Sequence, residues 1–137
     1  MKARTPAAKR GRARVERDER KPALIAIKRV YDEPTGDGGL RILIDRLWPR
    51  GLAKSTLKLD AWARELAPST QLREWYRHDP RLFAKFRRRY RAELAGRREE
   101  LEALRAMVKG REATLLTAVR ELDLSHAVVL REVLERD

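Results

Sequence analysis

Residues 41–51 read RILIDRLWPRG, and this stretch decides the fold more than any other part of the chain. An apolar run typical of a buried strand ends there abruptly in an acid, a guanidinium, an indole, a proline, a second guanidinium and a glycine. In open α/β sheets, ligands bind outside the carboxyl ends of the strands. The stretch therefore predicts a strand that leads directly into an anion-binding cleft.

The composition limits the size and the environment of the protein. The 137 residues, 42% of them apolar, suit one domain with a hydrophobic core, and the absence of cysteine excludes disulfides, thiolate catalysis and cysteine-ligated zinc. No apolar run approaches the ~20 residues that span a bilayer. The basic N-terminus lacks the apolar segment of a signal peptide. These features predict a cytoplasmic protein with no membrane partner.

The net charge of +12 is divided unevenly along the chain. Residues 1–22 carry nine Lys and Arg against three acids, and they are poor in branched apolar side chains. Such a segment cannot bury enough surface to offset the entropy of ordering. We predict a basic disordered tail over residues 1–22 and a single α/β domain over residues 23–137. A basic arm binds phosphate backbones without sequence preference, and the alternative is a solubilising tail.

Strand and helix patterns alternate after the tail. Strands are predicted over residues 24–30, 40–47 and 114–119, with a glycine-rich turn at residues 35–39. Helices are predicted from Asp60 through Leu66, from Ser69 through Tyr76, from Asp79 to Gly110 with a kink or break at Gly96, and from Asp123 or Ser125 through Val133.

Long helical connections favour a small parallel or mixed sheet covered by helices, because parallel strands need crossovers of this length. The ends of the second and third strands would then lie side by side. The short loop between the first two strands also permits an antiparallel hairpin, which would make the sheet mixed.

Several blocks of the sequence carry a family resemblance. The blocks KRVYDEP, RILIDRLWPRG, LDAWARELAPSTQLREWYRHDP and TLLTAVRELDLSHAVVL resemble, in order and spacing, the YeaO-like family of uncharacterised bacterial proteins, which belongs to the domain of unknown function family DUF488. The resemblance extends over residues 25–134. It implies a small cytoplasmic α/β domain with a polar cleft and no established reaction.

The family pattern can be carried over position by position. It falls on Lys28, Arg29, Asp45, Arg46, Trp48, Pro49, Arg50, Gly51, Pro68, Ser69, Leu72, Arg73, His78 and His126. Where the family pattern has Tyr, Lys and Asp, this chain has Thr117, Arg120 and Glu121. Where the pattern has Asn, this chain has Ser125. An arginine keeps its proton, so Arg120 can hold an anion but cannot act as a base.

Six residues are predicted to bind the ligand: Arg46, Trp48, Arg50, Ser69, Arg73 and Arg120. Guanidinium groups offer paired donors that fit phosphate or carboxylate, although Arg46 and Arg50 can equally form structural ion pairs with Asp45, Asp60 or Glu65. Trp48 either stacks on a ligand ring or covers the core. Ser69 either caps a helix or, together with Arg73, seats an anion.

His126, at the start of the last helix, is the candidate catalytic residue for proton transfer, and the alternative is a structural histidine. His78 fits a loop histidine that bonds the backbone. Two histidines at this spacing form no metal motif, and no metal ligand is predicted. The chain has neither a Walker nor a Rossmann glycine fingerprint, and no cofactor is indicated. Whether the protein is an enzyme stays open.

Two functional hypotheses follow. In the first, the domain binds a small anionic ligand, phosphorylated or nucleotide-like, at the cleft, with or without catalysis. In the second, a non-enzymatic protein binds nucleic acid through residues 1–22 and the arginine-rich helix around residues 87–91. A stripe of arginines beside an apolar helix face is also simply its solvated side. The sequence does not indicate an oligomeric state.

Overall fold

The computed structural model describes residues 24–32 and 39–136. The predicted tail, residues 1–22, and most of the predicted turn at residues 35–39 lie outside this described part of the chain.

Within the described residues, four parallel strands form the sheet, which confirms the α/β class. They are β1 (Leu24–Arg29), β2 (Leu40–Leu43), β3 (Ala61–Trp62) and β4 (Glu112–Thr117). The order across the sheet is β1-β4-β2-β3, so β4 lies between the first two strands. The predicted option of a hairpin between the first two strands, and with it a mixed sheet, is wrong. The reason is burial: β4 carries Leu115 and Leu116, which are almost completely buried and gain a neighbouring strand on each side.

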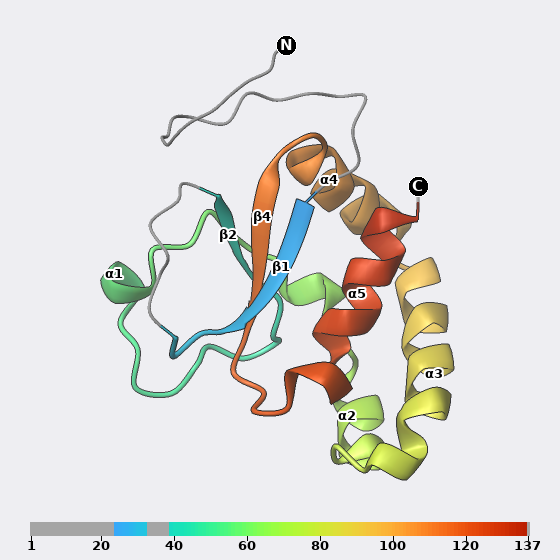
Figure 1. The fold of residues 1–137 in the computed structure, drawn as a ribbon. Coiled ribbons are helices and arrows are strands. Elements are labelled where there is room, and N and C mark those ends of the chain that lie inside the picture. Colours follow the sequence, from blue (N-terminus) through green and yellow to red (C-terminus); the bar gives the residue numbers. More distant parts are fainter. Residues whose placement is uncertain (1–23, 33–38, 137) are drawn as a thin grey trace.

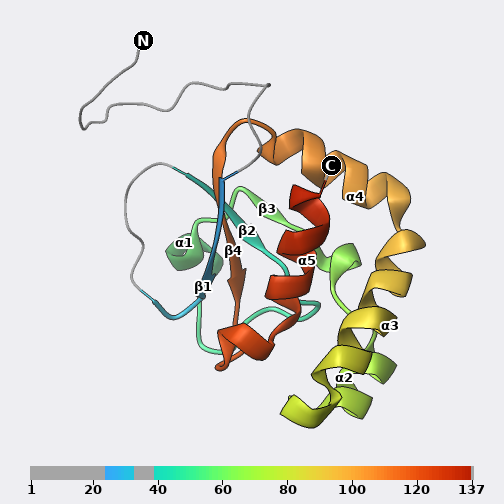
Figure 2. The same ribbon diagram turned by 45° about the vertical axis from the view of Figure 1, so that its right-hand side comes forward.

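Five helices accompany these strands in the described residues. They are α1 (Lys54–Leu57), α2 (Thr70–Tyr76), α3 (Phe83–Ala95), α4 (Arg98–Val108) and α5 (His126–Glu135), with short 3-10 turns at Arg64–Leu66, Pro80–Leu82 and Leu122–Leu124. Helices α2 to α5 lie together on one side of the sheet, and α1 lies on the other (Figures 1 and 2).

Local capping signals were good predictors of helix starts. The side chains of Ser69 and Ser125 accept backbone N–H groups at the first turns of α2 and α5, and Asp79 does the same for the 3-10 turn that leads into α3. The predicted break at Gly96 separates α3 from α4. Each of these features depends on residues close in sequence.

One predicted helix is wrong. Residues 61–62 form β3 rather than the first turn of a helix capped by Asp60. The carboxylate of Asp60 instead accepts the backbone N–H of Arg41 at 2.8 Å, which joins the start of β3 to β2. The predicted strand 40–47 ends earlier, at Leu43, and residues 45–50 form the loop that follows it.

Two apolar clusters cover the two faces of the sheet. The larger lies between the sheet and α2 to α5 and includes Ile42, Ile44, Phe86, Tyr90, Leu115 and Leu130. The smaller joins Val30, Leu43, Leu57 and Leu116, with Trp48 and Trp62 packed against them. Because both faces of β2 are covered, Ile42, Leu43 and Ile44 are all fully buried. The loop after β2 therefore starts from a rigid point.

Candidate functional site

A pocket of about 550 Å³ lies beyond the carboxyl ends of β2 and β4, where the sequence predicts a cleft. Of the seven predicted site residues, five line it: Arg46, Trp48, Arg50, Arg73 and His126. Ser69 and Arg120 do not. We divide its lining by exposure. The rim comprises the exposed residues Tyr31, Leu47, Arg50, Arg73, Glu74 and His78, and the inner wall comprises the buried and half-buried remainder.

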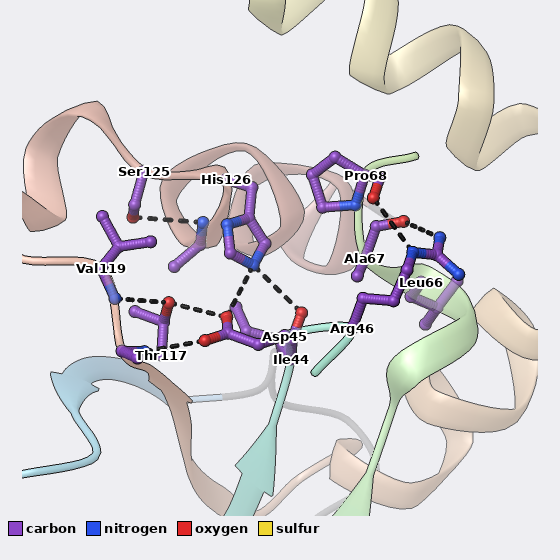
Figure 3. A network of polar contacts seen from close by, with 12 residues as sticks. Ile44, Asp45, Arg46, Leu66, Ala67, Pro68, Thr117, Val119, Ser125 and His126 are labelled. Atoms are coloured by element: carbon purple, nitrogen blue, oxygen red, sulfur yellow. Dashed lines mark hydrogen bonds and ion pairs between the residues drawn. The ribbon is translucent and has the colours of Figure 1, made fainter. Parts of the chain in front are cut away.

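Asp45 is the centre of a hydrogen-bond network in the inner wall (Figure 3). One carboxylate oxygen accepts the hydroxyl of Thr117 at 2.7 Å and lies 3.2 Å from Nε2 of His126. The other accepts the backbone N–H of Ala118 at 2.8 Å. This single side chain therefore joins the end of β2 to the end of β4 and to the start of α5.

These contacts keep the Asp45 carboxyl ionised. Burial by itself would raise its pKa, and it is the largest single influence. The hydrogen bond and charge of His126, with the bonds from Ala118 and Thr117, together outweigh burial and lower the pKa of Asp45. The network is thus built around a buried negative charge.

The structure places His126 in the inner wall with one ring nitrogen already engaged. Its Nε2 lies 3.0 Å from the carbonyl oxygen of Ile44 as well as close to Asp45. Both neighbours are acceptors, so Nε2 carries a proton and donates it. The edge of the ring also packs against Tyr90, with ring centroids 6.1 Å apart. These contacts hold the imidazole in one orientation.

Arg46 makes structural bonds, but not the predicted ion pairs. Its Nε and Nη2 donate to the carbonyl oxygens of Pro68 and Ala67 at 3.3 and 3.0 Å. Arg46 thereby fixes the segment that precedes α2 onto the end of β2 (Figure 3). None of the carboxylates of Asp45, Asp60 and Glu65 pairs with it in the described residues.

Trp48 is half-buried and packs on the smaller cluster. Its Nε1 donates to the carbonyl oxygen of Leu52 at 2.7 Å, and its ring meets that of Trp62 edge-on with centroids 5.4 Å apart. The side chain therefore both covers the core and lines the pocket.

Ser69 has an internal partner. Its hydroxyl and backbone N–H both donate to the carboxylate of Glu93, at 2.6 and 2.9 Å, and its hydroxyl also caps α2. The anion beside Ser69 is thus a side chain of the protein itself. Nothing in the sequence around Ser69 indicated this partner, because Glu93 lies on α3, 24 residues away.

The guanidinium groups of Arg50 and Arg73 are free. In the described part of the chain neither forms a hydrogen bond or ion pair through its side chain. Arg50 stands in the loop after β2, and its carbonyl oxygen accepts the hydroxyl of Tyr31 at 3.2 Å. Arg73 stands on α2. The exposed Arg120 lies in the segment after β4 and lines no part of this pocket.

Sequence reasoning missed three aromatic residues of the lining: Tyr31, Tyr76 and Phe86. Tyr31 follows β1, and Tyr76 donates its hydroxyl to the carbonyl oxygen of Leu124 at 2.7 Å. Both tyrosines occur in blocks that carry the family resemblance, KRVYDEP and the APSTQLREWYRHDP part of a longer block. Their place in these family blocks was the signal that could have identified Tyr31 and Tyr76 as site residues.

Within residues 24–32 and 39–136, no three His, Cys, Asp or Glu side chains gather closely enough to hold a metal ion. Of the helices found in these same ranges, none combines the length and the apolar character needed to span a membrane.

Comparison with known proteins identifies the family. The model of a family described as "Inactive DUF488-N3 subclade" matches residues 24–137. The chain belongs to the DUF488 family. An uncharacterised Escherichia coli protein named YeaO is 43% identical over 108 residues, which cover 79% of this chain and 94% of the relative.

Two further relatives are similar to this chain along most of their length. An uncharacterised protein of Mycobacterium bovis and one of Mycobacterium tuberculosis are each 39% identical over 110 residues, 80% of this chain and 92% of theirs. No solved structure matches the chain significantly. The resemblance indicated by the sequence blocks is therefore confirmed. These relatives are described as uncharacterised, so their names indicate no activity.

Proposed function

We propose that this DUF488-family protein is a cytoplasmic binding protein that takes a small anionic ligand, phosphorylated or nucleotide-like, in the pocket at the ends of β2 and β4. The observation that carries the proposal is the pair of free guanidinium groups of Arg50 and Arg73 on the rim. Among the described rim residues only Glu74 carries a carboxylate, so cationic charge prevails among them. Guanidinium groups bind phosphate and carboxylate through paired donors.

The inner wall supports binding. The bonds of Asp45, Arg46 and His126 are made within the protein, so these side chains are held in place before a ligand binds. A site that is already ordered loses less entropy on binding.

The proposal does not extend to catalysis. Nε2 of His126 already donates to internal acceptors, and no side chain with an activating base stands out as a nucleophile among the described lining residues. The matching family model describes an inactive subclade, which agrees with a binding role.

A thermal-shift titration of the full chain tests the proposal, with inorganic phosphate, mononucleotides and sugar phosphates as probes. A compound that binds the native state raises the melting temperature as its concentration rises. Arg50→Ala should abolish this response. Arg111→Ala is the matched control, because it removes the same charge just before β4, at the opposite end of that strand from the pocket. An equal loss of response in both variants would contradict the proposal.

Nucleic-acid binding is the second candidate, and one observation favours it. The arginine-rich part of α3 divides into two pairs: Arg87 and Arg91 bond Glu132 of α5, whereas Arg88 and Arg89 are exposed. Arg89 stacks over the ring of Trp75 at 4.3 Å. Exposed guanidinium groups beside an indole suit a phosphate backbone with bases.

The two candidates separate in a salt titration of the full chain with a single-stranded oligonucleotide. Binding through the tail and α3 should weaken steeply as salt rises, and Arg88→Ala with Arg89→Ala should reduce it. Arg50→Ala should leave it unchanged.

A further inference from the structure

Polar side chains of the inner wall have little capacity left for a ligand. The carboxylate of Asp45 accepts three bonds, the hydroxyl of Tyr76 donates to Leu124, and Nε1 of Trp48 donates to Leu52. Only Nδ1 of His126 and Nη1 of Arg46 lack a hydrogen bond among the polar side-chain atoms of the inner wall that the structure describes. Two such atoms can serve at most two polar groups of a ligand.

The small number of free hydrogen-bonding atoms in the inner wall limits which anionic ligands fit the pocket. The hydroxyl groups of a sugar phosphate would lose their water in the pocket and find few partners there. A polar group that is buried without a hydrogen bond costs free energy. The inner wall therefore disfavours ligands with many hydroxyl groups.

Apolar surface is concentrated at the same place. Four large hydrophobic side chains are exposed in the described residues, Leu24, Tyr31, Leu47 and Met107, and two of them, Tyr31 and Leu47, belong to the rim. Leu47 is 67% exposed and Tyr31 is 46% exposed. Pro49, Phe86 and Val119 add apolar wall behind them. Covering such surface with an apolar group is favourable in proportion to the area removed from water.

The volume agrees with a ligand larger than a bare anion. Sites for small organic molecules enclose about 300–1,000 Å³, and the pocket of about 550 Å³ falls in this range. Free cations and apolar side chains stand together on the rim. A complementary ligand therefore has both an anionic group and an apolar body.

We propose that the pocket selects an aromatic acid, a phosphate or carboxylate carried by an aromatic ring with few or no hydroxyl groups, over a sugar phosphate of equal charge. The inference rests on the proposed function, because it takes the anion to be held by Arg50 and Arg73. The ring lies against Leu47 and Tyr31 and fills the apolar part of the pocket.

Calorimetric titration of the full chain with phenyl phosphate and with ribose 5-phosphate tests this, at a pH where both are dianions. Phenyl phosphate should bind at least about tenfold more tightly, since the ring buries apolar surface that ribose does not. Leu47→Ser should weaken phenyl phosphate about threefold to tenfold and leave inorganic phosphate unchanged. Met107→Ser is the matched control, because it removes an exposed apolar side chain on α4, outside the pocket.

Each outcome decides between the two proposals. If ribose 5-phosphate binds as tightly as phenyl phosphate, the aromatic preference is wrong while the anion site stands. If Leu47→Ser weakens both organic phosphates and inorganic phosphate alike, the contact between Leu47 and the ring is wrong. If the wild-type chain binds none of the three, the proposed function fails, and the inference fails with it.

Discussion

The inner wall and the rim of the pocket differ in how their polar side chains are used. The five polar side chains of the inner wall all hydrogen-bond within the protein: Asp45, Arg46, Trp48, Tyr76 and His126. On the rim, no side-chain hydrogen bond or ion pair is made in the described residues by Arg50, Arg73, Glu74 or His78. Burial explains the difference, because an unpaired polar group costs free energy inside a protein and little at its surface.

The comparison teaches that similar residue types in one sequence block take different roles. Arg46 and Arg50 are four positions apart, yet one supports the fold and the other is available to a ligand. Variants of the inner wall should therefore change stability, and variants of the rim should change binding.

The largest effect is expected for Asp45→Ala. The change leaves Thr117, the N–H of Ala118 and His126 without their shared acceptor, and breaking a buried charge network of this kind costs about 3–5 kcal/mol. Urea denaturation of the variant and the wild type gives the difference in the free energy of unfolding. Asp45→Asn, which keeps the shape and one acceptor, should cost less. A loss below about 1 kcal/mol for Asp45→Ala would contradict the role of the inner wall.

Arg46→Ala should come next, with a loss of about 1–3 kcal/mol, because the carbonyl oxygens of Ala67 and Pro68 lose their donors in a partly buried place. Chemical denaturation again gives the measurement. Arg46→Lys is the sharper variant, since its single ammonium group replaces a fork of two donors, and we expect it to recover only part of the loss. Full recovery by Lys would show that charge matters more than geometry.

Acid should lower the free energy of unfolding through the same carboxylate, by less than Asp45→Ala does. The pKa of Asp45 in the folded protein is below its usual value of 3.8, so its contribution to stability is fully present above that value and is lost as the pH falls through the folded-state pKa. The free energy of unfolding should therefore fall as the pH is lowered below about 4. Asp45→Asn should flatten this part of the curve, and an unchanged curve would contradict the assignment to Asp45.

The smallest effect on stability is expected on the rim. Arg50→Ala should change the free energy of unfolding by no more than about 0.5 kcal/mol, because its exposed guanidinium has no partner in the described residues. The same measurement on Arg73→Ala tests the second rim arginine. A loss of about 2 kcal/mol in either variant would place that arginine with the inner wall.

Much of the fold could be predicted from local signals. Ser69, Asp79 and Ser125 cap their helices, Gly96 separates α3 from α4, and the apolar run before Asp45 is a buried strand. Such signals act over a few residues, so a reading along the chain finds them. Asp60 shows the limit: the same residue type at a possible helix start joins β3 to β2 instead, because the neighbouring strand offers a backbone N–H.

The sequence predicted the location of the candidate site better than it predicted the hydrogen-bond partners of the site residues. Strand topology placed Arg46, Arg50 and His126 near one cleft, since the carboxyl ends of parallel strands meet at one edge of a sheet, whereas Arg73 on α2 was proposed from the helix start and the family pattern. These signals did not distinguish the arginine that bonds the backbone from the two that are free. That distinction depends on which carbonyl groups and carboxylates come within reach after folding.

By itself, the sequence determined the α/β class, the family, the helix caps at Ser69, Asp79 and Ser125, and the edge of the sheet that carries the pocket. The class, the caps and the edge of the sheet follow from short-range patterning and from the few ways in which strands and helices alternate, whereas the family follows from the order and spacing of the sequence blocks that resemble it. Only the tertiary structure decided that β4 separates β1 from β2, that Glu93 occupies the N–H and hydroxyl of Ser69, and that Thr117 bonds Asp45 across 72 positions of chain. Contacts at such separations form when the whole chain packs, so no local pattern specifies them.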